Sequence, residues 1–111
     1  MAKKLSTSEL HQALKKLPGW EEGAKGKVIT KTYAFPTFVE AFSFMTRVAF
    51  YIEKTNHHPE WTNAYNKVHV NLLTHSCDGV SAKDISLALV MDDAAFAFLN
   101  PCMSDQSDLV F

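Results

Sequence analysis

Four prolines set the limits of the helices that this chain can form. Proline lacks a backbone N–H and its ring clashes with the preceding turn, so the interior of a helix rejects it. Pro18, Pro59 and Pro101 each follow a stretch with helical character, and Pro36 stands just before the second of these stretches. The residue before a proline is also biased away from helical backbone angles. These limits predict helices over residues 7–16, 37–56 and 81–100.

Each predicted helix begins with the same capping pattern, a hydroxyl residue three positions before an acid. In a capping box the hydroxyl accepts a hydrogen bond from a backbone N–H in the first turn, and the acid reaches back to the N–H of the cap. The third pair is the weaker match because aspartate replaces glutamate. The pairs are Ser6 with Glu9, Thr37 with Glu40 and Ser81 with Asp84.

The segments between the predicted helices have the patterns of strands. Residues 28–35 (VITKTYAF) are rich in β-branched and aromatic side chains. Residues 68–72 (VHVNL) alternate apolar and polar positions, which indicates a strand with one buried face. Residues 20–22 and 61–65 are the candidates for the strands that pair with them. The order of elements is therefore α-β-β-α-β-β-α.

Short connections between neighbouring strands favour antiparallel hairpins over parallel crossovers. We therefore expect an α+β fold, with helices packed on one face of a four-stranded antiparallel sheet. The 111 residues suit a single domain. We expect residues 101–111 to form a flexible tail or to cover an oligomer interface.

The two long helices carry apolar residues on two faces. In the second helix Phe38 and Phe42 lie on one stripe, and Phe44 and Val48 lie on another. A helix that is apolar on two sides is usually buried on both. One sheet covers only one side, so we expect the other to meet a neighbouring helix or a second subunit. A wide core-facing stripe is the alternative.

Composition and charge narrow the classes of protein. The chain is 47% apolar and 21% charged with a net charge of −1, which is ordinary for a globular domain and gives no surface for direct binding of nucleic acid or membrane. No apolar run approaches the ~20 residues that cross a bilayer, and the start lacks the apolar region of a secretory signal. We expect a cytoplasmic protein with free thiols at Cys77 and Cys102.

The stretch EKTNHHPEW, residues 53–61, places two histidines directly before a proline. His57 and His58 follow a predicted helix end, where the partial negative charge of the C-terminus favours a protonated imidazole. Glu53 stands four residues before His57 and would share its face if the helix persisted that far. His75 follows the 68–72 strand, at the kind of loop where a rigid scaffold presents chemistry.

Three interpretations of these histidines remain open from spacing alone. Imidazole titrates near neutral pH and suits a site that moves protons. A solvated or structural histidine pair is the second interpretation. A metal site is the third and weakest, because zinc requires three or four converging ligands and no HExxH motif is present. His11 and His69 are expected at the surface or paired across the sheet.

Residues 53–84, EKTNHHPEWTNAYNKVHVNLLTHSCDGVSAKD, closely resemble the pterin-4a-carbinolamine dehydratases. The pattern of that family runs E-K-x-(D/N)-H-H-P-x-W, then Y-x-x-V-x-(V/I)-x-L-x-T-H, then G-(L/V)-(S/T)-x-x-D. The resemblance extends over roughly residues 10–91. It implies a four-stranded antiparallel sheet under helices, assembly into homodimers or homotetramers through helix packing, and neither a metal nor an organic cofactor.

The resemblance also implies an activity. These hydro-lyases remove water from 4a-hydroxytetrahydrobiopterin and give quinonoid dihydrobiopterin, which recycles the tetrahydrobiopterin cofactor of aromatic amino acid hydroxylases. The active-site histidines of the family fall on His57, His58 and His75, and its supporting acids fall on Glu53 and Asp84. We predict His57 and His75 as the proton-transfer pair, with His58 positioning the substrate or serving as the alternative base.

Four neighbouring residues complete the predicted site. Asn56, Thr74 and Ser76 flank the histidines and could hydrogen-bond the pterin, and Trp61 could wall the pocket. A structural alternative stays open at three of the predicted site positions. Asp84 would cap the third helix, Trp61 would pack in the core, and Glu53 would pair with a lysine on the surface.

A binding role is the competing hypothesis. Some members of the family stabilise the dimer of a homeodomain transcription factor by binding its dimerisation helices, which would place the protein in the nucleus as a coactivator. The second apolar face of the 37–56 helix could serve this purpose, and we expect polar substitutions at Phe44 or Val48 to abolish such binding. A third hypothesis is pterin binding for another pathway.

Overall fold

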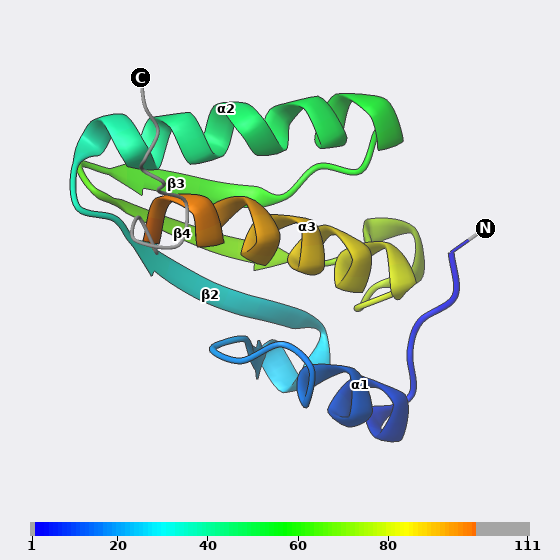
Figure 1. Ribbon diagram of the computed structural model, residues 1–111. Coiled ribbons are helices and arrows are strands. Elements are labelled where there is room, and N and C mark those ends of the chain that lie inside the picture. Colours follow the sequence, from blue (N-terminus) through cyan, green and yellow to red (C-terminus); the bar gives the residue numbers. More distant parts are fainter. Residues whose placement is uncertain (1, 100–111) are drawn as a thin grey trace.

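The structure is a computed structural model that describes residues 2–99 (Figure 1). The predicted order of elements is confirmed. The predicted tail at 101–111 and Cys102 lie outside the described residues. The elements are α1 (Thr7–Leu14), β1 (Glu21–Gly23), the 3-10 turn η1 (Ala24–Gly26), β2 (Val28–Ala34), α2 (Phe38–Thr55), β3 (Glu60–Ala64), β4 (Lys67–Leu72), the 3-10 turn η2 (His75–Cys77) and α3 (Ala82–Leu99).

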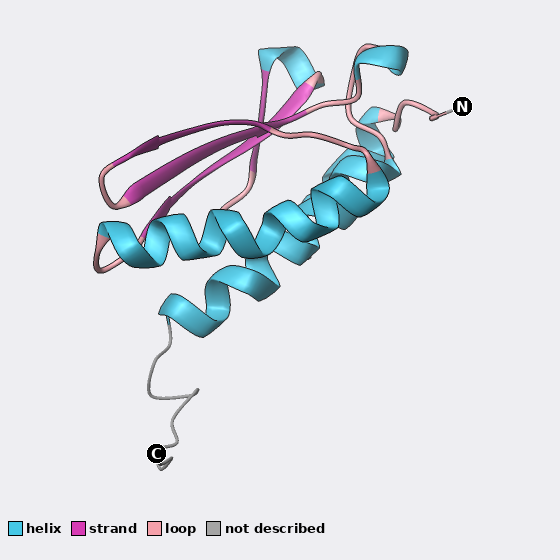
Figure 2. Cartoon of the chain, turned by 90° about the horizontal axis from the view of Figure 1, so that it is seen from above, coloured by secondary structure: helices cyan, strands magenta, loops and turns pink. Residues whose placement is uncertain are grey.

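The four strands form one antiparallel sheet in the order β1-β2-β4-β3, as the short connections predicted. The pairing of β2 with β4 joins the two hairpins, with Ile29 opposite Leu72. At the edge of the sheet β3 pairs with β4, with Trp61 opposite Val70. Figure 2 shows α2 and α3 together on one face of this sheet.

The helix limits follow from local hydrogen bonds. The predicted capping box at α1 is formed in both directions between Ser6 and Glu9. This helix ends at Leu14, two residues earlier than predicted, because the N–H groups of Lys16 and Leu17 bond three residues back and tighten the turn toward Pro18. At the end of α2, Asn56 adopts the left-handed conformation (φ 54°) and turns the chain toward β3.

The core lies between the sheet and the two long helices. Each large apolar side chain that is fully removed from water stabilises the fold by about 1.5–3 kcal/mol. Leu10, Leu17 and Trp20 extend this core under α1. Its central members are Ile29, Tyr33, Val68, Val70 and Leu72 from the sheet, Phe44 and Val48 from α2, and Leu87 and Met91 from α3.

The two-faced character of α2 is confirmed, but the face predicted to bind a partner was wrong. Phe44 and Val48 are fully buried in the core, so polar substitutions there would disrupt the fold before they affected binding. Helical periodicity separates two faces but does not show which one meets the sheet. The outer α2 face, as we call it, consists of the exposed residues Phe38, Val39, Phe42 and Phe50.

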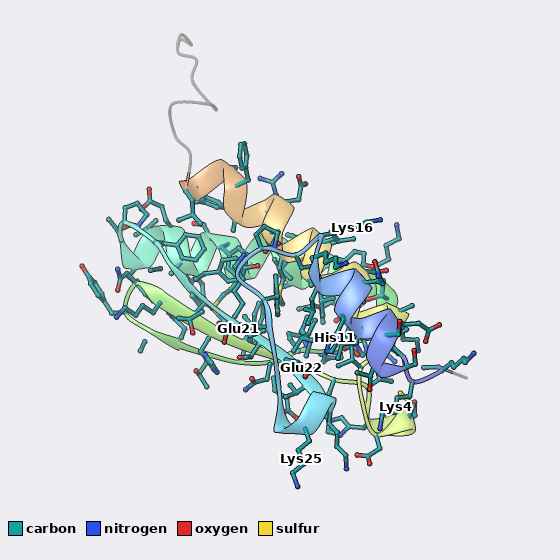
Figure 3. The ribbon with its side chains drawn as sticks, turned by 90° about the horizontal axis from the view of Figure 1, so that it is seen from below. Lys4, His11, Lys16, Glu21, Glu22 and Lys25 are labelled. Carbon is teal, nitrogen blue, oxygen red and sulfur yellow. The ribbon has the colours of Figure 1, made fainter. Side chains whose placement is uncertain are left out.

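Two further features concern the exposed residue His11 and the hydropathy of the helices. His11 of α1 is exposed, as predicted, and its Nε2 lies 3.2 Å from Oε1 of Glu22 on β1 (Figure 3). Within residues 2–99, no helix is both long enough and apolar enough to cross a membrane.

Candidate active site

The register of β3 against β4 brings the two histidine-bearing segments together. Glu60 is paired with Asn71 at the end of the ladder. In an antiparallel pair the chain entering one strand runs beside the chain leaving the other, so residues 57–59 lie near residues 72–74. The end of α2, the η2 turn and the start of α3 meet at this same end of the molecule (Figure 1).

His57 is held by a buried carboxylate from α3. Its Nε2 lies 2.6 Å from Oδ1 of Asp84, a short hydrogen-bond distance, and hydrogen bonds to charged acceptors are shorter than neutral ones. The Asp84 side chain is fully buried, and the His57 side chain is only 13% exposed. Asp84 belongs to the first turn of α3, where the helix dipole favours a negative charge.

The second oxygen of Asp84 binds the cap of the same helix. Its Oδ2 accepts hydrogen bonds from the Thr74 hydroxyl at 2.7 Å and from the backbone N–H of Ser81 at 2.9 Å. The bond to Ser81 is one half of the predicted capping box. The Ser81 hydroxyl accepts instead from the N–H of Lys83, at 3.2 Å. Asp84 therefore contacts both the cap of α3 and His57, and its predicted role as a supporting acid stays a prediction.

His75 belongs to a different pair. Its Nε2 lies 3.2 Å from Oε2 of Glu60, and the two side chains are 78% and 59% exposed. Asp78 directly follows the η2 turn that carries His75, and its Oδ2 lies 3.1 Å from Nζ of Lys27, the residue before β2. The hydrogen bond and charge of Lys27 hold the pKa of Asp78 below its usual value.

The remaining predicted residues lie around these two pairs. Trp61 is half-buried and packs edge-on against Phe44 with ring centroids 6.5 Å apart, which supports its core alternative. Thr74 is buried, with its hydroxyl bonded to Asp84. Four predicted residues are exposed, namely His58, Glu53, Asn56 and Ser76. Their roles stay predictions.

A cavity of 430 Å³ opens beside His57, between the end of α2 and the start of α3. Its volume is within the range of small-molecule pockets. Of the three predicted histidines, His57 lines this cavity, and His58 and His75 are not among its lining residues. Lys83 adds a positive charge. The cavity is lined by Tyr51, Thr55, His57, Ala82, Lys83 and Ser86.

Sequence reasoning missed two residues of this region. Ser81 was treated only as a helix cap, and Glu60 was passed over inside the HHPEW motif. The signal for Ser81 was present in its spacing to Asp84, but its contact with Thr74 depends on the fold. Within residues 2–99, no three His, Cys, Asp or Glu side chains are grouped in a way that could hold a metal ion. Cys77 is a free thiol.

Comparison with known proteins identifies the class. The family model described as "Pterin 4 alpha carbinolamine dehydratase" matches residues 3–94. The chain belongs to this family, whose members are hydro-lyases that act on pterins. The resemblance inferred from residues 53–84 is confirmed.

Relatives with similar sequences support this assignment. A protein of Rhizobium meliloti is 51% identical over 83% of this chain and 88% of its own length. A protein of Afipia carboxidovorans is 48% identical over 85% of this chain and 94% of its own length. Both are named as candidate pterin-4-alpha-carbinolamine dehydratases.

Solved structures agree on the fold. A crystal structure from Brucella melitensis, described as a transcriptional coactivator/pterin dehydratase, matches with a TM-score of 0.82 and 45% identity, covering 84% of this chain and 99% of that chain. A pterin dehydratase-like protein, described as a RuBisCO assembly factor in the alpha-carboxysome, matches with a TM-score of 0.61 over 69% of this chain. At 22% identity, this second match is evidence for the fold alone.

Proposed function

We propose that this protein dehydrates 4a-hydroxytetrahydrobiopterin to quinonoid dihydrobiopterin in the recycling of tetrahydrobiopterin. Membership of the hydro-lyase family supports the reaction class. The single observation that carries the site is the 2.6 Å contact between His57 and the buried Asp84. A carboxylate that fixes the orientation and tautomer of an imidazole prepares that ring for proton transfer.

The reaction needs two proton movements. The C4a–O bond breaks as the hydroxyl oxygen takes a proton and leaves as water. N5 loses its proton, and the electron pair of that bond forms the C4a=N5 double bond. A neutral imidazole can accept the N5 proton while an imidazolium protonates the leaving oxygen. One turnover therefore exchanges the protonation states of the two rings, and proton exchange with water restores them.

We assign these roles first to His57 and His75. The His57 side chain is only 13% exposed and lines the cavity, which suits a base that must be oriented. His75 is exposed beside Glu60, on the turn that directly follows Thr74. His58 positions the substrate or serves as the alternative base. Each positioned proton donor or acceptor contributes a factor of about 10²–10⁴ in rate.

A turnover assay with 4a-hydroxytetrahydrobiopterin tests the proposal. We expect His57→Ala to lower kcat by about 10²–10⁴ while circular dichroism shows a native fold. His11→Ala is the matched control, because His11 is an exposed histidine on α1 and should leave kcat unchanged. Unaltered dehydration by a variant that lacks both His57 and His58 would exclude the assignment.

We also propose that the protein forms a homodimer or homotetramer through the outer α2 face. Four large apolar side chains in one exposed stripe are typical of an interaction surface. Phe50 is the most exposed of them, at 76%. Light scattering should report a smaller particle for Phe50→Ser than for the wild type. Tyr65→Ser, at an exposed aromatic residue on the β3–β4 turn, is the control that should keep the wild-type size.

Stabilisation of a transcription-factor dimer is the second candidate function. It is favoured by the same outer α2 face and by the coactivator description of the Brucella melitensis structure. A fluorescently labelled peptide carrying the dimerisation helices of a homeodomain factor can be titrated with the protein. Binding that is lost in Phe42→Ser, while dehydration is retained, would support this function, and no binding by the wild type would exclude it.

A further inference from the structure

A buried chain of hydrogen bonds lies behind His57. Thr74, Ser81 and Asp84 are buried polar residues, and all three belong to this chain of hydrogen bonds. The Thr74 Oγ1 is 2.7 Å from Oδ2 of Asp84 and 2.7 Å from Oγ of Ser81. Three interlinked polar groups without access to water need a complete set of partners, so their protons are expected to have fixed places.

The direction of each bond in this chain follows from its fixed donors. A backbone N–H can only donate, so Lys83 donates to Ser81 Oγ and Ser81 donates to Oδ2 of Asp84. A carboxylate can only accept, so the single proton of the Thr74 hydroxyl goes to Asp84. The Thr74 oxygen is then the acceptor for the proton of the Ser81 hydroxyl.

Since each hydrogen bond needs one donor and one acceptor, the contact with Asp84 also determines which nitrogen of His57 carries a proton. Both oxygens of Asp84 are acceptors, so the Nε2 that lies 2.6 Å from Oδ1 must donate. In a neutral imidazole the other nitrogen, Nδ1, is then free of a proton and can act as a base. We propose that Asp84, Thr74 and Ser81 hold His57 in the Nε2–H tautomer, so that Nδ1 is the atom that exchanges a proton with the pterin.

This inference gives Thr74 and Ser81 a role in the reaction. They are positioning residues that act on His57 through Asp84 and do not touch the substrate. For Thr74 this differs from the predicted hydrogen bond to the pterin, because its only hydroxyl proton is directed to Asp84. The identity of the substrate rests on the proposed function, but the tautomer of His57 does not.

Asp84→Asn is the decisive variant, because the donors at the helix cap determine the orientation of the asparagine amide. The N–H of Ser81 and the hydroxyl of Thr74 both need an acceptor at the Oδ2 position, so the amide oxygen belongs there. The amide NH₂ group then faces His57 as a donor, and Nε2 must accept. We expect the tautomer of His57 to invert to Nδ1–H and kcat to fall by about 10²–10⁴.

Nuclear magnetic resonance reads the tautomer without any substrate. Two-bond ¹H–¹⁵N correlation spectra of the full chain, labelled with ¹⁵N-histidine, show which ring nitrogen is protonated once the ring is neutral. The signals of His57 are assigned by their loss in His57→Gln. Wild-type protein should show Nε2–H, and Asp84→Asn should show Nδ1–H. Asp93→Asn, which removes a charge from an exposed position of the same helix, should leave both spectrum and kcat unchanged.

Kinetics of Thr74 variants separate positioning from substrate binding. Thr74→Val keeps the shape of the side chain but removes its hydroxyl, so we expect kcat to fall roughly tenfold with KM unchanged. Thr74→Ser should restore kcat. A rise in KM with unchanged kcat would make Thr74 a pterin contact and overturn the positioning role.

The outcomes distinguish this inference from the proposed function. A wild-type spectrum with Nδ1–H, or Asp84→Asn that keeps Nε2–H, would overturn the inference. If Asp84→Asn fails to fold, the wild-type spectrum alone decides the tautomer. A wild-type protein with Nε2–H on His57 and no dehydration of the pterin would support the inference about the ring while excluding the proposed substrate.

Discussion

Two aspartates of α3 lie about two helical turns apart, and each binds three hydrogen-bond donors, yet the donors differ in kind. Asp84 binds an imidazole, a hydroxyl and a backbone N–H. Asp92 binds the indole N–H of Trp20 at 3.0 Å, the ammonium group of Lys31 at 2.9 Å and the phenol of Tyr33. The two carboxylates of this helix thus bind the same number of donors, but the chemical groups that donate are different.

The donors around Asp92 join elements of the fold to one another. Trp20 comes from the segment after α1, and Lys31 and Tyr33 come from β2. Lys31 also donates to the carbonyl of Pro18 at 3.0 Å and lies 4.7 Å from the centre of the Tyr33 ring. Burial, followed by the hydrogen bond and charge of Asp92, raises the pKa of Tyr33 far above its ordinary value. None of these three donors is an imidazole, the side chain best suited to proton transfer near neutral pH.

The difference shows that an aspartate with three hydrogen-bond donors is not by itself a sign of catalysis. What separates the two sites is a partner that is an imidazole and that also lines a cavity. His57 has both properties, since it is bonded to Asp84 and lines the 430 Å³ cavity. Trp20, Lys31 and Tyr33 carry no imidazole and are not among the residues that line that cavity. We therefore expect Asp84 to govern activity and Asp92 to govern stability.

The largest expected effect tests this division through activity. Asp84→Ala removes the group that orients His57, so kcat should fall by about 10²–10⁴, equivalent to roughly 3–5 kcal/mol in the barrier. The same truncation at Asp92 should leave kcat of the folded protein close to wild type. Steady-state kinetics on both variants provide the measurement. Equal losses of kcat would remove the distinction between the two aspartates.

The next effect concerns the free energy of unfolding. Asp92→Ala leaves an indole N–H, a phenol and a part-buried ammonium without their shared acceptor, and each such loss typically costs about 1–3 kcal/mol. Water can reach Lys31, so we expect a total decrease of about 2–4 kcal/mol, measured by urea unfolding at neutral pH. Asp93→Ala is the control, at an exposed position next to Asp92. A decrease below that of Asp93→Ala would show that the cluster does not hold β2 to α3.

A smaller effect depends on pH and isolates Tyr33. Its folded pKa is raised above the unfolded value of ~10, so the fold favours the neutral phenol. The stability that this provides is complete below pH ~10 and is lost as the pH rises further, by about 1.4 kcal/mol per pH unit. Tyr33→Phe cannot ionise, so its deficit relative to wild type should shrink between pH 10 and pH 11. A difference in unfolding free energy that stays constant over this range would contradict the burial of the phenol.

The order of the elements could be predicted from sequence because local chemistry decides it. Prolines and capping pairs act within a few residues, and alternation in residues 68–72 reports directly on a strand. The arrangement of the candidate site was harder to predict from the sequence. The pairing of Glu60 with His75 depends on the β3–β4 register and on the η2 turn, and the contact of Ser81 with Thr74 joins two segments across a bridge between Thr74 and Gly79.

Faces of helices were harder to predict than helices themselves. Phe44 and Val48 looked equivalent to Phe38 and Phe42 in periodicity, but only the packing of α2 on the sheet shows which pair is inside. The role of Asp92 was also hidden in sequence. Asp92 and Asp93 are adjacent in an apolar helix, and only the position of β2 decides which of them meets three donors.

The smallest expected effect tests whether a carboxylate that pairs with a histidine affects kcat when the pair is exposed. Glu60 pairs with His75 as Asp84 pairs with His57, but both members of the Glu60 pair are exposed. Exposed ion pairs contribute about 0–1 kcal/mol, so Glu60→Gln should leave the free energy of unfolding unchanged within that range and lower kcat at most severalfold. Kinetics at low and high salt check this, because water and ions already screen the charge of Glu60. A loss of kcat as large as that of Asp84→Ala would mean that an exposed carboxylate beside a histidine is as effective as a buried one. The difference in activity between the Asp84 and Asp92 variants would then depend on the histidine partner alone.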